Sequence, residues 1–119
     1  MWEKRILLIR NQTKGTVLAD KADVADTSEK RRTGLLKHTG LGVGEGLWIK
    51  PSEGVHTFGM KFAIDVIFVS KKGVVLKLRS NMVKRRISFC LTGHSVVELP
   101  VGVIEGSRTA KGDQLEFVK

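Results

Sequence analysis

One continuous apolar run, from Ala63 to Val69, constrains the fold of this chain more than any other segment. Apart from Asp65, its side chains are apolar at both odd and even positions, and a strand of this kind needs cover on both of its faces. The turn signal SKKG follows at residues 70–73, and Val74 to Arg79 then returns with alternating character. The pattern predicts a β-hairpin whose first strand lies in the centre of a sheet.

Short strands separated by turn signals account for most of the remaining chain. Thirteen glycines punctuate the 119 residues, as is typical of a fold with many tight turns. The other expected strands are Arg5 to Arg10 and Thr16 to Ala22, which form an opening hairpin, then Gly46 to Lys50, Val96 to Leu99 and Gln114 to Val118, with a looped stretch from Ser80 to Arg86. About seven short strands predict a mainly β fold, either a β-sandwich of the jelly-roll kind or a partly open barrel.

One short helix is expected between residues Asp26 and His38. Asp26 can cap its N-terminus, Glu29 completes a capping-box spacing, and Gly40 suits a left-handed stop. The four glycines of residues 39–46 that follow match neither the P-loop nor the dinucleotide-binding fingerprint, and no strand leads directly into them. We interpret this glycine-rich stretch as a connector rather than a phosphate-binding loop.

The length and the charge of the chain limit its class. Its 119 residues suffice for one domain, and we expect a single domain over residues 1–119. A net charge of +9 favours anionic partners such as nucleic acid or an anionic surface. The basic clusters Lys30–Arg32 and Lys84–Arg86 are not interleaved with aromatic residues that stack on bases. We therefore favour a solvated basic surface, with nucleic-acid binding as the alternative.

Cys90 is the only cysteine, which excludes an intrachain disulfide and a zinc site built on several thiolates. It lies in the apolar run Ile87 to Leu91, which predicts a buried and inert thiol. The apolar run Ile6 to Ile9 is too short for the core of a signal peptide or for a membrane span, so the expected location is the cytoplasm. No nucleophile motif is present, and the sequence gives an enzyme little support; we predict no cofactor, and a monomer or weak oligomer.

Two carboxylates stand among apolar neighbours and are costly to bury. Asp65 lies between Ile64 and Val66, and Glu98 lies between Val97 and Leu99. Each must be hydrogen-bonded or paired, or else face a site where the cost serves binding. In the first alternative the two carboxylates are structural and hold loops to the barrel. The second makes them part of a cleft, together with Arg31 from the predicted helix.

The stretch HTFGMKF adds further candidate residues before the central strand. His56 could join His94 and the two carboxylates in a metal site, but no spacing of histidines prepares one. Met60 and its phenylalanine neighbours suit either a core or the apolar wall of a ligand cleft. We predict a non-catalytic binding domain for a small molecule or protein segment, with no metal ligands. Its candidate binding residues are Arg31, His56, Phe58, Met60, Asp65 and Glu98.

From Ala25 to Asp113 the chain resembles the domain-of-unknown-function 192 family. The segments that carry the resemblance are ADTSEKRRTGLL, GEGLWIKPSEGVHTFGMKFAIDVIFVSKKGVV and VVELPVGVIEGSRTAKGDQLEF, in the same order as in the family. The chain departs from it at Gly59, where the family usually has a large aromatic residue, and at Ala63, where it often has proline. The resemblance implies a mainly β, sandwich-like or jelly-roll-like domain with a short helix, and no established activity. The positions that match the family signature are Arg31, Gly34, Leu35, His56, Phe58, Met60, Asp65, Glu98, Leu99, Pro100, Gly102, Gly112 and Asp113.

Overall fold

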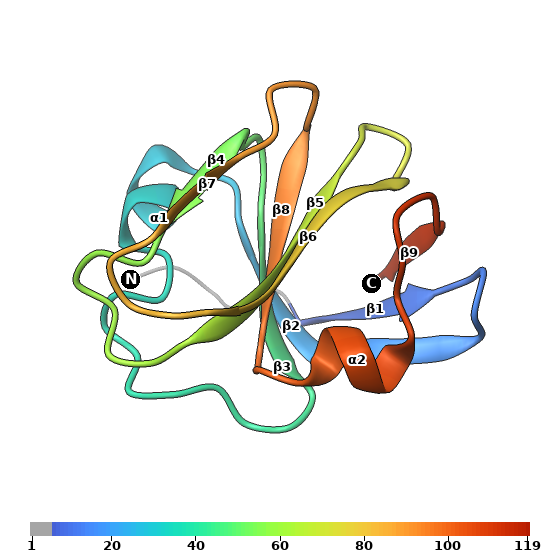
Figure 1. Ribbon diagram of the computed structural model, residues 1–119, viewed down its shortest axis with the longest axis horizontal. Coiled ribbons are helices and arrows are strands. Elements are labelled where there is room, and N and C mark those ends of the chain that lie inside the picture. Colours follow the sequence, from blue (N-terminus) through green and yellow to red (C-terminus); the bar gives the residue numbers. More distant parts are fainter. Residues whose placement is uncertain (1–5) are drawn as a thin grey trace.

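A computed structural model describes residues 6–119, in which nine strands and two short helices are found. Seven strands form one sheet in the order β6-β5-β8-β3-β2-β1-β9, and β4 and β7 form a separate two-stranded ribbon (Figure 1). Within the large sheet only β2 and β3 run parallel. The strands are β1 (Leu7–Asn11), β2 (Thr16–Ala25), β3 (Glu45–Ile49), β4 (Gly54–His56), β5 (Ile64–Val69), β6 (Val75–Met82), β7 (Ile87–Phe89), β8 (Ser95–Leu99) and β9 (Leu115–Val118), and the helices are α1 (Ser28–Thr33) and α2 (Val103–Ser107).

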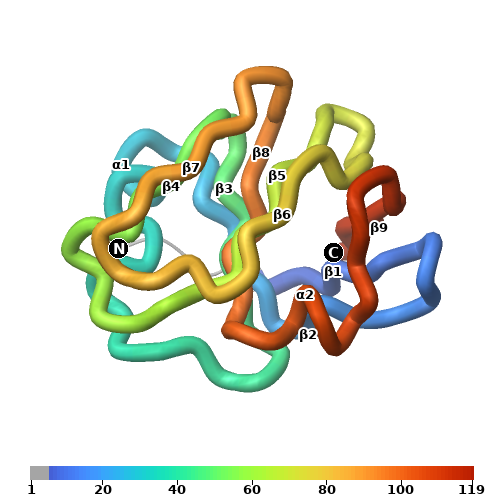
Figure 2. The backbone as a smooth tube through the Cα atoms, in the orientation of Figure 1, coloured from blue at the N-terminus to red at the C-terminus, as the bar shows by residue number. Residues whose placement is uncertain are grey.

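The large sheet curls into a half-barrel, which confirms the mainly β fold expected from the sequence (Figures 1 and 2). Its two edge strands approach each other at one end, where Val74 forms an isolated bridge with Gln114. The Val75 N–H also donates to the Asp113 carbonyl over 2.8 Å. Backbone hydrogen bonds between the edges leave less of each edge unpaired, as in a closing barrel.

The central-strand prediction is confirmed in β5. All six of its residues are buried, and it lies between β6 and β8. Ile67 packs in a cluster with β1 and β2 residues on one face of the sheet. Val66 packs in a second cluster on the other face, together with Leu35, which follows α1, and Val55 on β4. Burial on both faces is therefore the reason for the continuous apolar run.

Both predicted hairpins are present, as β1–β2 and β5–β6. Arg5, the first residue of the predicted opening strand, lies outside the described residues. The described residues form two strands beyond the seven or so expected, β4 and β7. In addition, β6 continues to Met82, into the stretch expected to be a loop. The apolar run Ile87 to Leu91 does not bury its thiol fully: Cys90 is half-buried, which corrects that expectation.

The predicted helix is much shorter than residues 26–38. α1 begins after Thr27, whose hydroxyl accepts from the Lys30 N–H at 3.1 Å, so Thr27 rather than Asp26 is the cap. It ends at Gly34, with φ of 48°, and not near Gly40. A glycine in this left-handed region ends a helix without the steric cost that other residues incur.

The second helix, α2, was not predicted. It is only five residues long, and its preceding residue Gly102 has φ of 99°. Its first turn is held by a carboxylate from the sheet: Asp65 accepts from the Gly102 and Ile104 N–H groups at 3.1 and 3.0 Å. A helix this short lacks internal stability, so a contact distant in the sequence decides that it forms.

Candidate functional site

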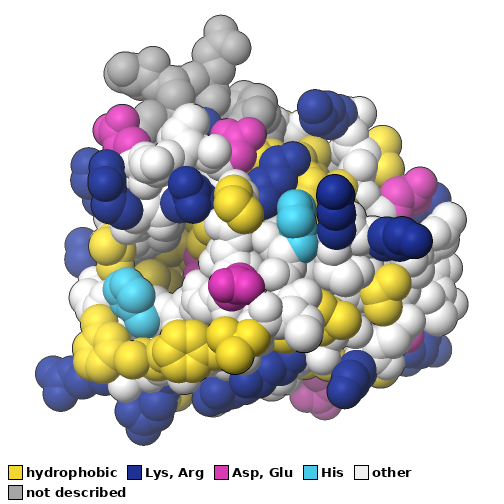
Figure 3. Space-filling view, turned by 90° about the horizontal axis from the view of Figure 1, so that it is seen from above, with side chains coloured by type: hydrophobic (Ala, Val, Ile, Leu, Met, Phe, Trp, Pro, Cys, Tyr) yellow, Lys and Arg dark blue, Asp and Glu magenta, His cyan; other side chains and the backbone are white. Residues whose placement is uncertain are grey.

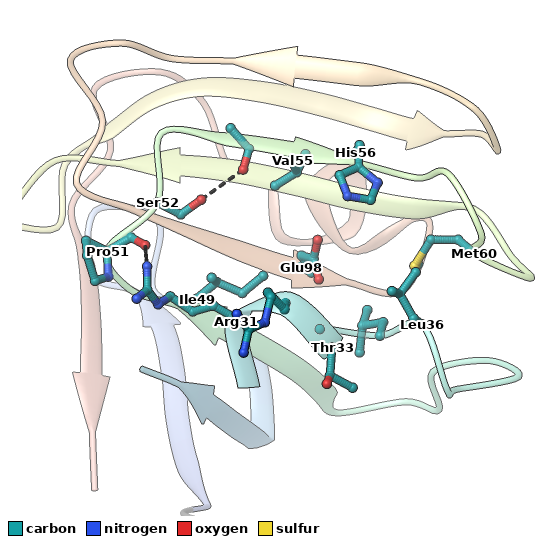
Figure 4. Close-up of a pocket in the computed structure, with 14 residues that line it drawn as sticks. Arg31, Thr33, Leu36, Ile49, Pro51, Ser52, Val55, His56, Met60 and Glu98 are labelled. Carbon is teal, nitrogen blue, oxygen red and sulfur yellow. Dashed lines mark hydrogen bonds between the residues drawn. The ribbon is translucent and has the colours of Figure 1, made fainter. Parts of the chain in front are cut away.

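A cavity of about 150 Å³ lies between α1, the end of β3, β4 and β8. Figure 4 shows Arg31 on the α1 side, Glu98 rising from β8, and Val55 and His56 on the overlying β4 strand. In Figure 3 the surface is hollowed beside a histidine and several Lys and Arg side chains. The lining residues are Arg31, Arg32, Thr33, Gly34, Leu35, Leu36, Ile49, Pro51, Ser52, Gly54, Val55, His56, Met60 and Glu98.

Glu98 enters the cavity from β8. Its partners across the sheet are Leu47 on β3 and Val66 on β5, so its side chain lies on the same face as theirs. The residue is only 5% exposed, and no hydrogen bond or ion pair joins its carboxyl group to another residue of the described part. Burial without a partner raises the pKa of Glu98 from 4.5 to about 7.

Arg31 reaches the same cavity from α1. Its Nε is buried and has no hydrogen-bond partner among the described residues. The terminal nitrogens make only long contacts of 3.5 Å, from Nη1 to the Pro51 carbonyl and from Nη2 to the Ser28 hydroxyl. A guanidinium carries five N–H donors in a fixed plane. In Arg31 the Nε–H donor has no acceptor among the described residues.

Arg31 and Glu98 therefore line one cavity without forming an ion pair with each other. A buried donor and a buried carboxyl group that have no protein partner require water or a ligand in the cavity to complete their hydrogen bonds. A molecule that bridges them would take the place of that water. This pairing is the strongest chemical feature in the described part of the chain.

The sequence candidates from the HTFGMKF stretch separate in space. Met60 is buried and belongs to both the cavity wall and the core cluster beneath it. His56 lies exposed at the cavity mouth. Phe58 does not line the cavity: it is 48% exposed, and its ring centroid is 6.1 Å from that of His56. Gly59, with φ of 81°, occupies a conformation that suits glycine rather than the aromatic residue usual in the family.

Asp65 does not meet Glu98. It is paired with Leu99 across the sheet, one position along from the Val66–Glu98 pair, so its side chain points to the opposite face. Its carboxylate accepts from three backbone N–H groups, those of Asn81 at 2.8 Å, Gly102 and Ile104. Asp65 thus holds β6 and α2 against the sheet and does not line the cavity.

Several cavity residues were missed in the sequence, among them Leu36, Ile49 and Ser52. Pro51, which ends a strand, was the one local signal that the chain turns here. The Ser52 hydroxyl donates to the Gly54 carbonyl at 2.8 Å and so shapes the wall. Among residues 6–119, no group of three or more His, Cys, Asp or Glu side chains is placed to hold a metal ion.

Comparison with known proteins identifies the family. Residues 9–117 match the domain-of-unknown-function 192 family, DUF192, whose description is "Uncharacterized ACR". The chain belongs to this family. A UPF0127 protein of Thermococcus sibiricus is 30% identical over 115 residues, which span 92% of this chain and 74% of that protein.

Two crystal structures share the DUF192 fold seen here. One, of a protein of unknown function from Novosphingobium aromaticivorans, has a TM-score of 0.80 at 21% identity and covers 95% of this chain and 84% of its own. The other, described as a candidate transcription regulator from Sinorhizobium meliloti, has a TM-score of 0.82 at 18% identity and covers 98% and 95%. At these identities the likeness shows the fold alone. None of the helices in the described part has the length and apolar character needed to span a membrane.

Proposed function

We propose that this domain binds a small polar molecule in the cavity between α1, β4 and β8. The observation that carries the proposal is the presence of two unpartnered buried groups, the Arg31 Nε and the Glu98 carboxyl, in one cavity. Proteins seldom leave such groups unsatisfied without a functional reason. The shared groove inferred from the sequence is retained for Arg31, His56, Met60 and Glu98.

The size of the cavity limits the ligand. Its volume of about 150 Å³ is below the range of roughly 300 Å³ and more that is usual for drug-sized ligands. The cavity therefore suits a compact molecule, or one terminal group of a longer molecule that leaves through the mouth beside His56.

The chemistry of the walls defines the ligand class. Arg31 offers N–H donors and requires an oxygen acceptor, such as a carbonyl or carboxylate oxygen. Glu98 with a pKa of about 7 is present in both forms at neutral pH, and its ionised form accepts from an amide or ammonium N–H. A ligand that carries an oxygen acceptor and an N–H donor a few atoms apart satisfies both. Primary amides are the simplest molecules of this class.

Binding rather than catalysis fits the geometry best. The Ser52 hydroxyl in the wall donates to a carbonyl oxygen and not to a base that could activate it. Met60 and Ile49 contribute an apolar floor, and the two polar groups fix orientation, as in many binding sites.

A titration with acetamide tests the proposal. The Arg31 Nε–H gives its own cross-peak in ¹H–¹⁵N spectra, and the proposal expects that peak and the Glu98 backbone amide to shift together as acetamide is added. Glu98→Leu and Arg31→Lys should each abolish the response. Lys71→Gln, on an exposed turn, should leave it unchanged. An unshifted Arg31 peak at high acetamide concentration, or a response that survives in Glu98→Leu, contradicts the proposal.

A further inference from the structure

A strip of exposed apolar side chains runs along the outer face of the β4–β7 ribbon. Ile87 is 51%, Phe89 60% and Leu91 78% exposed, and Phe58 lies beside them. Figure 3 shows a continuous hydrophobic strip along one border of this face, with Lys and Arg side chains in a row beneath it. Apolar residues scattered singly on a surface are normal, but a contiguous rimmed patch marks an interaction site.

The ribbon holds these side chains outward by its register. Gly54 is opposite Phe89 and His56 is opposite Ile87, while Val55 and Ser88 between them are buried. Gly54 leaves room for the ring, since a Cβ there would come within 3.0 Å of Phe89 Cδ1. Strand alternation therefore directs Ile87 and Phe89 outward, whereas Phe58 and Leu91 lie in the turns next to the ribbon.

Hydrogen bonds fix the ribbon to the loop that follows β6. The buried Thr57 hydroxyl donates to the Val83 carbonyl at 2.6 Å and accepts from the Arg86 N–H at 2.9 Å. The exposed residues Lys84 and Arg85 lie between these two anchors. The apolar strip and the basic cluster thus form one surface with fixed positions.

The charge of this surface has a single sign over a long stretch. Residues 76–94 contain five Lys or Arg and no Asp or Glu. On the other side of β7, Lys77 Nζ donates to the Phe89 carbonyl at 2.7 Å, so positive charge flanks the strip from two directions. Glu53, just before β4, is the acidic residue nearest to the ribbon in the sequence.

We propose that this surface docks peripherally on an anionic phospholipid membrane, with Phe58, Phe89 and Leu91 entering the interface and the basic cluster contacting headgroups. Apolar side chains that enter the headgroup region, together with Lys and Arg that attract anionic lipid, are the two components of reversible membrane binding. Charge complementarity selects anionic lipid as the occupant. Ile87 and Leu91 suit acyl chains but offer no ring on which a base can stack, whereas Phe58 and Phe89 suit either partner.

Co-sedimentation with lipid vesicles tests the proposal. The protein should bind vesicles that contain phosphatidylserine and phosphatidylcholine, and bind vesicles of phosphatidylcholine alone far more weakly. Two charges near the surface contribute about fivefold each, so Lys84→Gln with Arg85→Gln should weaken binding roughly twenty-five-fold. Phe89→Ser with Leu91→Ser should weaken it at least tenfold by removing the buried apolar area.

Matched variants separate this surface from general effects of charge and exposure. Lys71→Gln with Lys72→Gln removes two charges from a turn outside the surface, and Val43→Ser removes a valine that is 94% exposed elsewhere. Both should bind vesicles like the unaltered protein, as should Glu98→Gln, because the proposal does not depend on the cavity. All variants are compared at a temperature at which each of them is folded.

Three results would overturn the proposal. The first is the absence of binding to phosphatidylserine vesicles at low salt. The second is binding that Lys71→Gln with Lys72→Gln weakens as much as the Lys84 and Arg85 changes do, which would indicate net charge alone. The third is binding that is insensitive to the Phe89 and Leu91 changes while a single-stranded oligonucleotide competes for the basic cluster, which would indicate a nucleic-acid surface.

Discussion

Replacing Glu98 with glutamine should stabilise the protein at neutral and alkaline pH, and this test bears most directly on the cavity. Glutamine has nearly the shape of the protonated acid but cannot ionise. Burial raises the pKa of Glu98 from 4.5 to about 7. The difference of about 2.5 pKa units, at about 1.4 kcal/mol per unit, corresponds to about 3 to 4 kcal/mol of unfolding free energy.

The sign follows from proton linkage. Between pH 4.5 and pH 7 the folded protein holds a proton on Glu98 that the unfolded chain has released. The unfolding free energy of the unaltered protein therefore falls as the pH rises through this window, and the loss is complete above about pH 7. The contribution of the buried, protonated Glu98 to the unfolding free energy is fully present below pH 4.5. Glu98→Gln lacks this titration and should keep its stability.

Urea unfolding of both proteins between pH 4 and pH 8 gives the measurement. The difference in unfolding free energy should be near zero at pH 4 and should reach about 3 to 4 kcal/mol in favour of Glu98→Gln at pH 8. Other titrating groups are common to both proteins and cancel in the difference. A constant difference across the range, or a variant less stable than the unaltered protein at pH 8, would refute the assignment of Glu98 as an unpartnered buried acid.

Two other carboxylates should behave in the opposite way, because each is satisfied. Asp65→Asn retains one acceptor for three backbone donors, so it should cost about 3 kcal/mol and lower the melting temperature by roughly 10 °C, with exposed Asp20→Asn as the control. Hydrogen bonds from Asn11 and then Lys14 lower the pKa of Asp113 from 3.8 to about 2. Its contribution to stability should be complete above pH 3.8 and lost as the pH falls through about 2, and Asp113→Asn should flatten the melting-temperature profile there.

Local patterns predicted those parts of the fold that depend on neighbours in the sequence. The run Ala63 to Val69 predicted a strand covered on both faces, and β5 is such a strand. The turn at residues 70–73 predicted the β5–β6 hairpin, which is also present. The length of the helix was overestimated because its apolar and capping signals are compatible with several C-terminal ends. The tertiary structure fixed the length through the cap at Gly34 and the burial of Leu35 in the core directly after it.

The site could be predicted only in part. The sequence identified Asp65 and Glu98 as carboxylates that are costly to bury and named Arg31 as a partner. It offered the same two roles, structural or ligand-binding, for both acids. Strand register separates them: Glu98 is opposite Val66 and Asp65 is opposite Leu99, so they face different sides of the sheet. Asp65 finds three backbone donors there, and Glu98 finds a cavity.

The apolar run Ile87 to Leu91 shows the same limit. Its composition predicted a buried segment around Cys90, yet Ile87 and Phe89 face outward from the β4–β7 ribbon and Leu91 is exposed in the turn that follows. By itself, therefore, the sequence determined the fold class, the hairpins and which groups would be expensive to bury, since these follow from local periodicity and side-chain chemistry. Only the tertiary structure decided which faces meet and which stay open, because pairing between strands distant in the chain sets the direction of every side chain on them.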